Sequence, residues 1–175
     1  METGKPINYV GKNVRIGKNV KIWHFTYIGD NTVIGDNVMI GSLCHIDYNV
    51  KIGNNVRIEG SCYIPPLTVI GNNVFIGPAT VFTNDPYPPS KRLVGVIVED
   101  DVVIGARSVI KAGVKLGKGC VVAMGSVVTR DVQPNTVVLG NPAKPIYDRS
   151  VYENKKKKWE EQTLFENTFN SNIVP

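Results

Sequence analysis

Isoleucine recurs at every sixth position through the first half of the chain. The series starts at Ile16 and runs without a gap to Ile76, and Phe82 takes the next step. An amphipathic helix does not give this period, because its apolar stripe recurs every three and four residues. A step of six instead fits a short strand followed by a corner, repeated many times. The chain is therefore predicted to coil.

Each six-residue unit has the same internal pattern. A small or β-branched residue, such as Val38 or Val56, stands two positions before the Ile, so both side chains lie on one face of a strand. Gly usually follows the Ile, and Asn often stands three positions after it, as at Asn37 and Asn55. Gly and Asn accept the positive φ of a tight corner. Each unit thus supplies two inward side chains and one turn.

Three units close one coil of 18 residues, and the coils stack at the usual strand spacing of about 4.8 Å. The predicted fold is all-β: a parallel β-helix whose three flat parallel sheets enclose an aliphatic interior. Cys44 and Cys62 stand 18 residues apart at inward positions. A disulfide between them is geometrically conceivable, but buried reduced thiols are the favoured interpretation. The predicted stacks are Ile16, Ile34, Ile52 and Ile70; Ile22, Ile40, Ile58 and Ile76; and Ile28, Ile46, Ile64 and Phe82.

The period breaks once, between Phe82 and Val98. The segment Thr83 to Gly95 is polar, rich in proline and too long for one corner, so it is predicted to project as a loop. A repeat protein that interrupts its period with a polar loop often builds a site there.

Past the last repeat, three prolines between residues 131 and 145 are expected to limit regular structure. A helix is predicted from Tyr147 to about Asn167, with Asp148 or Ser150 as its N-cap. The chain is accordingly divided into a β-helix domain, 1–145, and a C-terminal helix and tail, 146–175.

The hexads resemble those of the hexapeptide-repeat acyltransferases over about residues 10–145. That resemblance implies a left-handed coil, which the spacing alone does not give and which departs from the usual right-handed crossover. It also implies a homotrimer with active sites between subunits. The segment Asp131 to Pro145, ending in Gly-Asn-Pro-Ala-Lys-Pro, resembles the closing coil of that family. This coil implies acetyl-CoA as the co-substrate.

Two shorter stretches are similar to bacterial N-acetyltransferases of nucleotide-linked amino sugars. They are Ile22-Trp23-His24-Phe25 and the segment from Gly77 to Asn84. The resemblance implies that Asn84 faces the amino group of the sugar. The sequence departs from these relatives at Glu59-Gly60-Ser61, where they usually carry Gln-Asn-Asn.

Three residues are the candidates for catalysis. A neutral amine needs little help from a base, and Asn84 can orient it through hydrogen bonds. Asp85 is a candidate base or a partner for an ammonium group, and His24 is a candidate acid or base by its ordinary pKa. The simpler alternatives are that Asn84 and Asp85 only form a turn before Pro86, and that His24 packs against Trp23 or Phe25.

The other histidine, His45, is expected on an outer flat face, where packing against a neighbouring subunit is as plausible as catalysis. Some proteins with this type of coil are metal-dependent carbonic anhydrases that use three histidines. The present chain has two histidines. No metal site is predicted, and no metal is expected to be required.

Coenzyme A is expected to lie along the later coils, where small residues let its arm approach the backbone. Lys144 and Arg149 are candidates for its phosphates, as the closing segment of the family suggests. The candidate cofactor-binding residues are Gly105, Ala106, Ala123, Met124, Gly125, Lys144 and Arg149.

Charge and composition limit the classes of ligand and partner that the chain is expected to bind. The net charge of +5 suits an anionic ligand. The lysine run 155–158 is followed at once by Glu160 and Glu161, so a solvated helix face is favoured over nucleic-acid binding. No apolar run approaches membrane-spanning length, and the first ten residues lack an apolar signal core, so a cytoplasmic location without membrane insertion is predicted.

Together these features predict an enzyme that moves an acetyl group from acetyl-CoA to the amino group of a nucleotide-linked sugar in surface-glycan biosynthesis. One alternative is an O-acetyltransferase acting on a sugar or serine hydroxyl, with His24 or His45 as base. The other is a non-catalytic assembly or binding protein that keeps only the scaffold.

Overall fold

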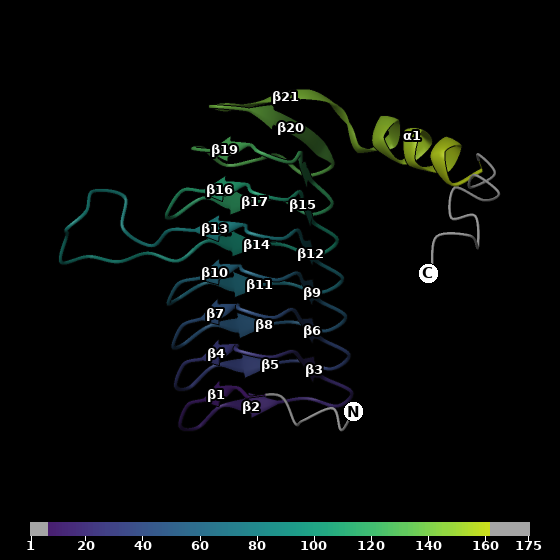
Figure 1. Ribbon diagram of the computed structural model, residues 1–175. Helices are drawn as coiled ribbons and strands as arrows, with labels where there is room; N and C mark the ends of the chain where they lie inside the picture. The colour runs from purple at the N-terminus through teal and green to yellow at the C-terminus, as the bar shows by residue number, and fades with distance from the viewer. Residues whose placement is uncertain (1–6, 162–175) are drawn as a thin grey trace, which may run out of the picture.

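The chain forms a left-handed parallel β-helix in the computed structural model, which describes residues 7–161 (Figure 1). Nineteen two-residue strands wind around three faces. Sheet A contains β1 (Tyr9–Val10), β4 (Tyr27–Ile28), β7 (His45–Ile46), β10 (Tyr63–Ile64), β13 (Val81–Phe82), β16 (Val109–Ile110) and β19 (Val127–Val128). Sheet B contains β2 (Arg15–Ile16), β5 (Val33–Ile34), β8 (Lys51–Ile52), β11 (Val69–Ile70), β14 (Ile97–Val98) and β17 (Lys115–Leu116). Sheet C contains β3 (Lys21–Ile22), β6 (Met39–Ile40), β9 (Arg57–Ile58), β12 (Phe75–Ile76), β15 (Val103–Ile104) and β18 (Val121–Val122), and it is extended by β20 (Thr136–Gly140) and β21 (Ala143–Asp148).

The predicted stacks are confirmed. Ile28 pairs with Ile46 in parallel register, and Ile70 pairs with Val98 across the interrupted period. Most of the stacked side chains are fully buried and form one continuous aliphatic core. Most of the inward hydroxyls are hydrogen-bonded to corner carbonyls, as Thr32 Oγ1 is to the carbonyl of Asp47 at 2.9 Å, whereas the buried Thr68 Oγ1 has no partner within residues 7–161. The core is therefore a column of apolar layers with a few polar groups, most of them hydrogen-bonded.

The corners are of three kinds, named here by the sheets they join: corner 1 leads from sheet A to sheet B, corner 2 from B to C, and corner 3 from C to A. At corner 2 an asparagine holds a positive φ in coil after coil. The side chains of these asparagines form a hydrogen-bonded ladder, from Asn37 to Asn55 at 3.2 Å and from Asn55 to Asn73 at 3.1 Å. The expected role of Asn at the turns is confirmed there.

The long loop leaves corner 1 between β13 and β14 and projects away from the coil (Figure 1). Its two ends are tied together by the amide of Val94, which donates to the carbonyl of Asn84 at 2.8 Å. Thr83 fixes the start of the loop, because its hydroxyl accepts a hydrogen bond from the amide of Ala112 in the next coil at 2.8 Å.

The closing segment corrects one expectation. Despite the prolines, β20 and β21 form an antiparallel hairpin that turns at Asn141–Pro142, with a shift of register between Val137 and Val138. Because β21 continues to Asp148, the helix α1 begins at Arg149 rather than at Tyr147, and it is described to Glu161. Residues 162–167 of the predicted helix lie outside the described residues. The division at residue 145 stays a prediction, and β21 runs across it.

Two further observations concern the sequence predictions. Cys44 and Cys62 lie inward in adjacent coils as free thiols, and Cys120 is also buried and free. Cys44 donates to the carbonyl of Glu59 at 3.1 Å, so it behaves as a small inward side chain. Within residues 7–161 no helix is long and apolar enough to cross a membrane.

Candidate functional site

Asn84 is held at corner 1 where the loop leaves the coil. Its backbone carbonyl closes the loop, and the side chain is half-buried. No residue between 7 and 161 hydrogen-bonds its side-chain amide. A fixed backbone with an unoccupied amide can both donate to and accept from a bound ligand. This geometry is what an orienting residue needs.

The side chain of Asp85, the next residue, is hydrogen-bonded within the loop. Its carboxylate accepts hydrogen bonds from the amide of Tyr87 at 2.9 Å and from the amide and hydroxyl of Ser90 at 2.7 and 2.8 Å. Desolvation would raise the pKa of this carboxyl, but these hydrogen bonds outweigh it and hold the pKa below its ordinary value. The carboxylate is therefore a weak base whose evident work is to shape the loop.

The two histidines lie in different places. His24 is half-buried at corner 3, with its ring 5.9 Å from that of Phe25. His45 lies on the outer face of sheet A and stacks on Tyr27 at a centroid distance of 4.5 Å. Its Nε2 is 3.9 Å from the Oδ2 of Asp47. In one chain, His24 and Asn84 stand on different corners of the prism.

Corner 3 differs from corner 2 in the residues that hold the positive φ, because none of them is asparagine. The position with positive φ holds Phe25, Leu43, Ser61, Ala79 and Arg107 in successive coils. A side chain other than Gly, Asn or Asp costs roughly 1 kcal/mol or more in this conformation. Strain of this kind gathers at functional sites. The pattern was visible in the sequence, where corner 3 lacks the asparagines of corner 2.

Five of the predicted cofactor residues come together at the upper end of corner 3. Gly105, Ala123 and Met124 line a groove of about 240 Å³ that we call the upper groove, and Ala106 and Gly125 adjoin it. Gly105 is also required by packing, because a Cβ there would lie 2.4 Å from the amide nitrogen of Met124. Tyr147 and Tyr152 complete its wall. Sequence reasoning missed both tyrosines, which reach the groove only because the hairpin folds back.

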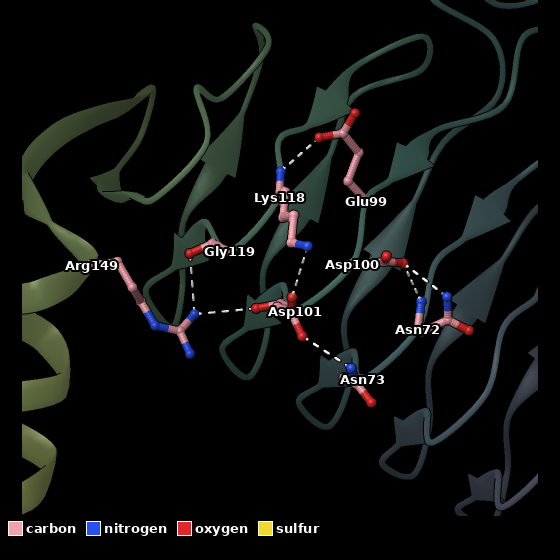
Figure 2. A network of polar contacts seen from close by, with 8 residues as sticks. All are labelled: Asn72, Asn73, Glu99, Asp100, Asp101, Lys118, Gly119 and Arg149. Carbon is pink, nitrogen blue, oxygen red and sulfur yellow. Dashed lines mark hydrogen bonds and ion pairs between the residues drawn. The ribbon is translucent and has the colours of Figure 1, made fainter.

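Neither of the two predicted phosphate ligands lines the upper groove, although the Arg149 guanidinium lies over the ring of Tyr152 at 5.3 Å. Lys144 is exposed on β21 and lines a separate hollow of about 670 Å³ beside Arg130. Arg149 docks α1 on corner 2, where it donates to the carbonyls of Asp101 and Gly119 at 3.3 and 3.2 Å (Figure 2). Its guanidinium also pairs with Glu153. Arg149 therefore has a structural task in this chain.

The candidate residues thus form two groups on the two edges of one face. Asn84 and the loop stand at corner 1, and His24 with the upper groove stands at corner 3. Both corners border sheet A. No group of three or more His, Cys, Asp or Glu side chains within residues 7–161 could hold a metal ion.

Comparison with known proteins agrees with this architecture. A family described as "Bacterial transferase hexapeptide (six repeats)" matches residues 9–35 and 31–66. A second, "Hexapeptide repeat of succinyl-transferase", matches residues 95–130. The two families together match more than half of the chain, on both sides of the projecting loop.

Individual relatives share parts of this pattern. A 2,3,4,5-tetrahydropyridine-2,6-dicarboxylate N-acetyltransferase from Staphylococcus aureus is 48% identical over 82 residues, which are 47% of this chain. The match spans about a third (34%) of that relative's length.

Solved structures show the same fold. AntD, an N-acyltransferase from Bacillus cereus, matches with a TM-score of 0.67 and 23% identity over 86% of this chain and 92% of its own. A UDP-N-acetylglucosamine acyltransferase from Campylobacter jejuni matches with a TM-score of 0.61 and 23% identity over 91% and 74%. The repeats, the three-sided coil and the family matches agree: this chain belongs to the hexapeptide-repeat transferases.

Proposed function

We propose that the protein is an acetyl-CoA-dependent N-acetyltransferase whose acceptor is the amino group of a nucleotide-linked sugar. The observation that carries the proposal is the free side-chain amide of Asn84, held on a rigid corner beside a projecting loop. AntD supports the acceptor class, since its structure holds dTDP-4-amino-4,6-dideoxyglucose and coenzyme A. The Staphylococcus aureus relative supports acetyl transfer to nitrogen through its name.

Acetyl transfer needs alignment more than a strong base. The neutral amine attacks the thioester carbonyl carbon, a C–N bond forms and the C–S bond breaks. The proton lost by the amine ends on the departing thiolate, so the products are an amide and free coenzyme A. Asn84 orients the amine, and the upper groove holds the pantetheine arm against backbone amides. Asp85 keeps the loop in shape while this occurs.

The site is completed by a second copy of the chain. The outer positions of the sheet A strands carry no Lys, Arg, Asp or Glu, whereas sheets B and C carry cations such as Lys51 and Arg57. An uncharged, partly exposed face is suited to burial between subunits. Three copies docked through sheet A around a threefold axis would bring corner 1 of each against corner 3 of the next. The protein is accordingly proposed to be a cytoplasmic homotrimer with sites between subunits.

A second candidate is O-acetyl transfer, because one arrangement on sheet A favours it. His45 Nε2 faces the carboxylate of Asp47, and the hydroxyl of Tyr63 lies 3.5 Å from that carboxylate. A histidine beside a carboxylate is a plausible general base for a hydroxyl acceptor.

The test is release of free thiol from acetyl-CoA, measured with a panel of 3-amino and 4-amino nucleotide sugars and with the matching hydroxyl sugars. The proposal expects thiol release with at least one amine and none with the hydroxyl compounds. Release with hydroxyl compounds alone would replace it with the second candidate. No release with either class would reject both.

A further inference from the structure

A second groove lies lower on corner 3, at the level of the first three coils. It encloses about 410 Å³, a size suited to part of a small-molecule ligand. Trp23 and Met39 form an apolar wall, Gly41 and Ser42 the floor, and Arg57 and Glu59 a charged wall. We call it the lower groove. Nothing in the acetyl-transfer step described above uses it.

Two contacts position Arg57 in this groove. Its Nε donates to Glu59 Oε1 at 2.5 Å, and its guanidinium lies over the ring of Phe75 at 5.9 Å. Within residues 7–161, the terminal Nη groups make no hydrogen bond. The cation is also the more exposed partner of the pair, at 57% against 29% for the Glu59 side chain. A fixed guanidinium with its outer edge free suits a phosphate, which accepts two parallel hydrogen bonds.

Trp23 supplies a different kind of contact. Its side chain is 43% exposed although it belongs to the groove wall. An exposed indole beside a guanidinium is the combination that binds a nucleobase by stacking and its phosphates by charge.

The position of the lower groove along the axis of the β-helix suits the acceptor substrate rather than the acetyl donor. The last residue that lines the lower groove is Gly60, just before β10. Asn84 follows β13, one coil further along the β-helix. The upper groove lies above that level, on β15 and β18. In the trimer proposed above, Asn84 of a neighbour would stand between the two grooves. A molecule seated in the lower groove could therefore extend upward to the amine-orienting residue.

We propose that the lower groove binds the nucleoside diphosphate part of the acceptor, with Trp23 stacked on the base and Arg57 bound to the diphosphate. This inference rests on the proposed function for the identity of the whole acceptor. The binding site itself does not depend on acetyl transfer. Glu59 acts as a positioning residue that holds Arg57.

The chain allows a direct binding measurement, because it contains two tryptophans. In a Trp159→Phe protein the remaining indole, Trp23, reports on the groove. Titration with UDP, dTDP and GDP in the absence of acetyl-CoA should give saturable quenching of its fluorescence with at least one of them. Pyrophosphate alone should bind more weakly than that nucleotide. Coenzyme A, which also carries a nucleoside diphosphate, should not compete.

Calorimetric titrations of substituted proteins with the nucleotide then show which side chains contact it. Arg57→Gln should weaken nucleotide binding by about tenfold or more, since hydrogen bonds to charged groups are the strong ones. Arg57→Lys, which keeps the charge but loses the fork, should recover only part of this loss. Trp23→Ala should weaken binding by about tenfold. Lys21→Gln is the matched control, because Lys21 lies two strands below Arg57 in the outer row of sheet C, outside the groove, and it should stay within about twofold of wild type.

The outcomes separate this inference from the proposed function. If no nucleoside diphosphate quenches Trp23, or if coenzyme A displaces the nucleotide, the assignment is overturned even when acetyl transfer to an amine is observed. Equal losses for Arg57→Gln and Lys21→Gln would also overturn it, because the effect would then come from overall charge. Nucleotide binding without any acetyl transfer would uphold the groove and reject the proposed function.

Discussion

The asparagine ladder at corner 2 allows a sharp test of the backbone that forms the coil. Asn55 holds φ at +55°, and its side chain joins Asn37 below and Asn73 above. Replacing it with Ala removes both side-chain hydrogen bonds and places a Cβ without a polar group in the left-handed region. Replacing it with Gly removes the same hydrogen bonds but leaves no side chain to strain.

The magnitudes follow from these differences. Two exposed hydrogen bonds contribute about 1 kcal/mol together to the free energy of unfolding. Ala adds a left-handed penalty of about 1–2 kcal/mol. Asn55→Gly instead lowers the free energy of unfolding further, by about 0.5–1 kcal/mol, because an unfolded chain with Gly has more conformational entropy to lose on folding. We therefore expect Asn55→Ala to cost about 2.5 kcal/mol and Asn55→Gly to cost less, by roughly 0.7 kcal/mol.

Lys18 provides the control, since it is an exposed corner 2 residue outside the positive-φ set. There the order should reverse, with Ala more stable than Gly. The measurement is urea unfolding followed by circular dichroism at one fixed protein concentration, because assembly links stability to concentration. If Ala is the more stable substitution at both positions, the left-handed corner is refuted.

Four further predictions concern the candidate catalytic residues, the loop and the buried thiol of Cys120. Asn84→Ala should lower kcat/KM for the amine acceptor by about a hundredfold, because alignment is lost, while His45→Ala should cost less than about tenfold unless the acceptor is a hydroxyl. Asp85→Asn should speed trypsin cleavage after Lys91 and Arg92, because the carboxylate that organises the loop is gone. Since the folded pKa of Asp85 lies below its ordinary 3.8, the protection of the wild-type loop against hydrogen exchange, taken relative to the intrinsic exchange rate at each pH, should stay constant from pH 8 to 5 and fall only as the pH drops through that lowered value. Burial raises the pKa of Cys120 to about 12, so it should resist alkylation at pH 8 in the folded protein and react after unfolding, as an alkylation time course followed by mass spectrometry would show.

The coil itself could be predicted from the sequence, because one physical requirement repeats in every six-residue unit. An inward Ile and a turn six residues apart leave few alternatives, and the break after Phe82 marks the loop by its length and polarity. The phase shift at Val98 was also readable, since the inserted segment changes the register but not the order of faces. Handedness is different: the spacing fits either hand, and only the family resemblance predicted the one observed.

The closing segment and the grooves were harder to predict from the sequence. Prolines at 142 and 145 argue against a sheet interior, yet the hairpin places them at a turn and on an outer strand, where a missing amide is tolerated. Phosphate binding by Arg149 stays a prediction, but the sequence did not indicate that its guanidinium also donates to the carbonyls of corner 2. The lower groove depends on residues from three coils, 23 to 60, whose nearness comes only from the 18-residue step.

The most direct test of a site shared between subunits uses two inactive variants. Asn84→Ala removes the orienting amide at corner 1, and Ala123→Trp fills the upper groove at corner 3. Each variant alone should be inactive. Co-expressed at equal levels, with different tags to confirm co-assembly, the whole trimer population should recover about one quarter of wild-type acetyl transfer, since one neighbour in two supplies Asn84 and one in two supplies an open groove. Mixed trimers isolated through both tags should recover about one third, because each holds one complete site in three. Mixed assemblies that form but stay inactive would contradict the account, because both halves of the site would then belong to one chain.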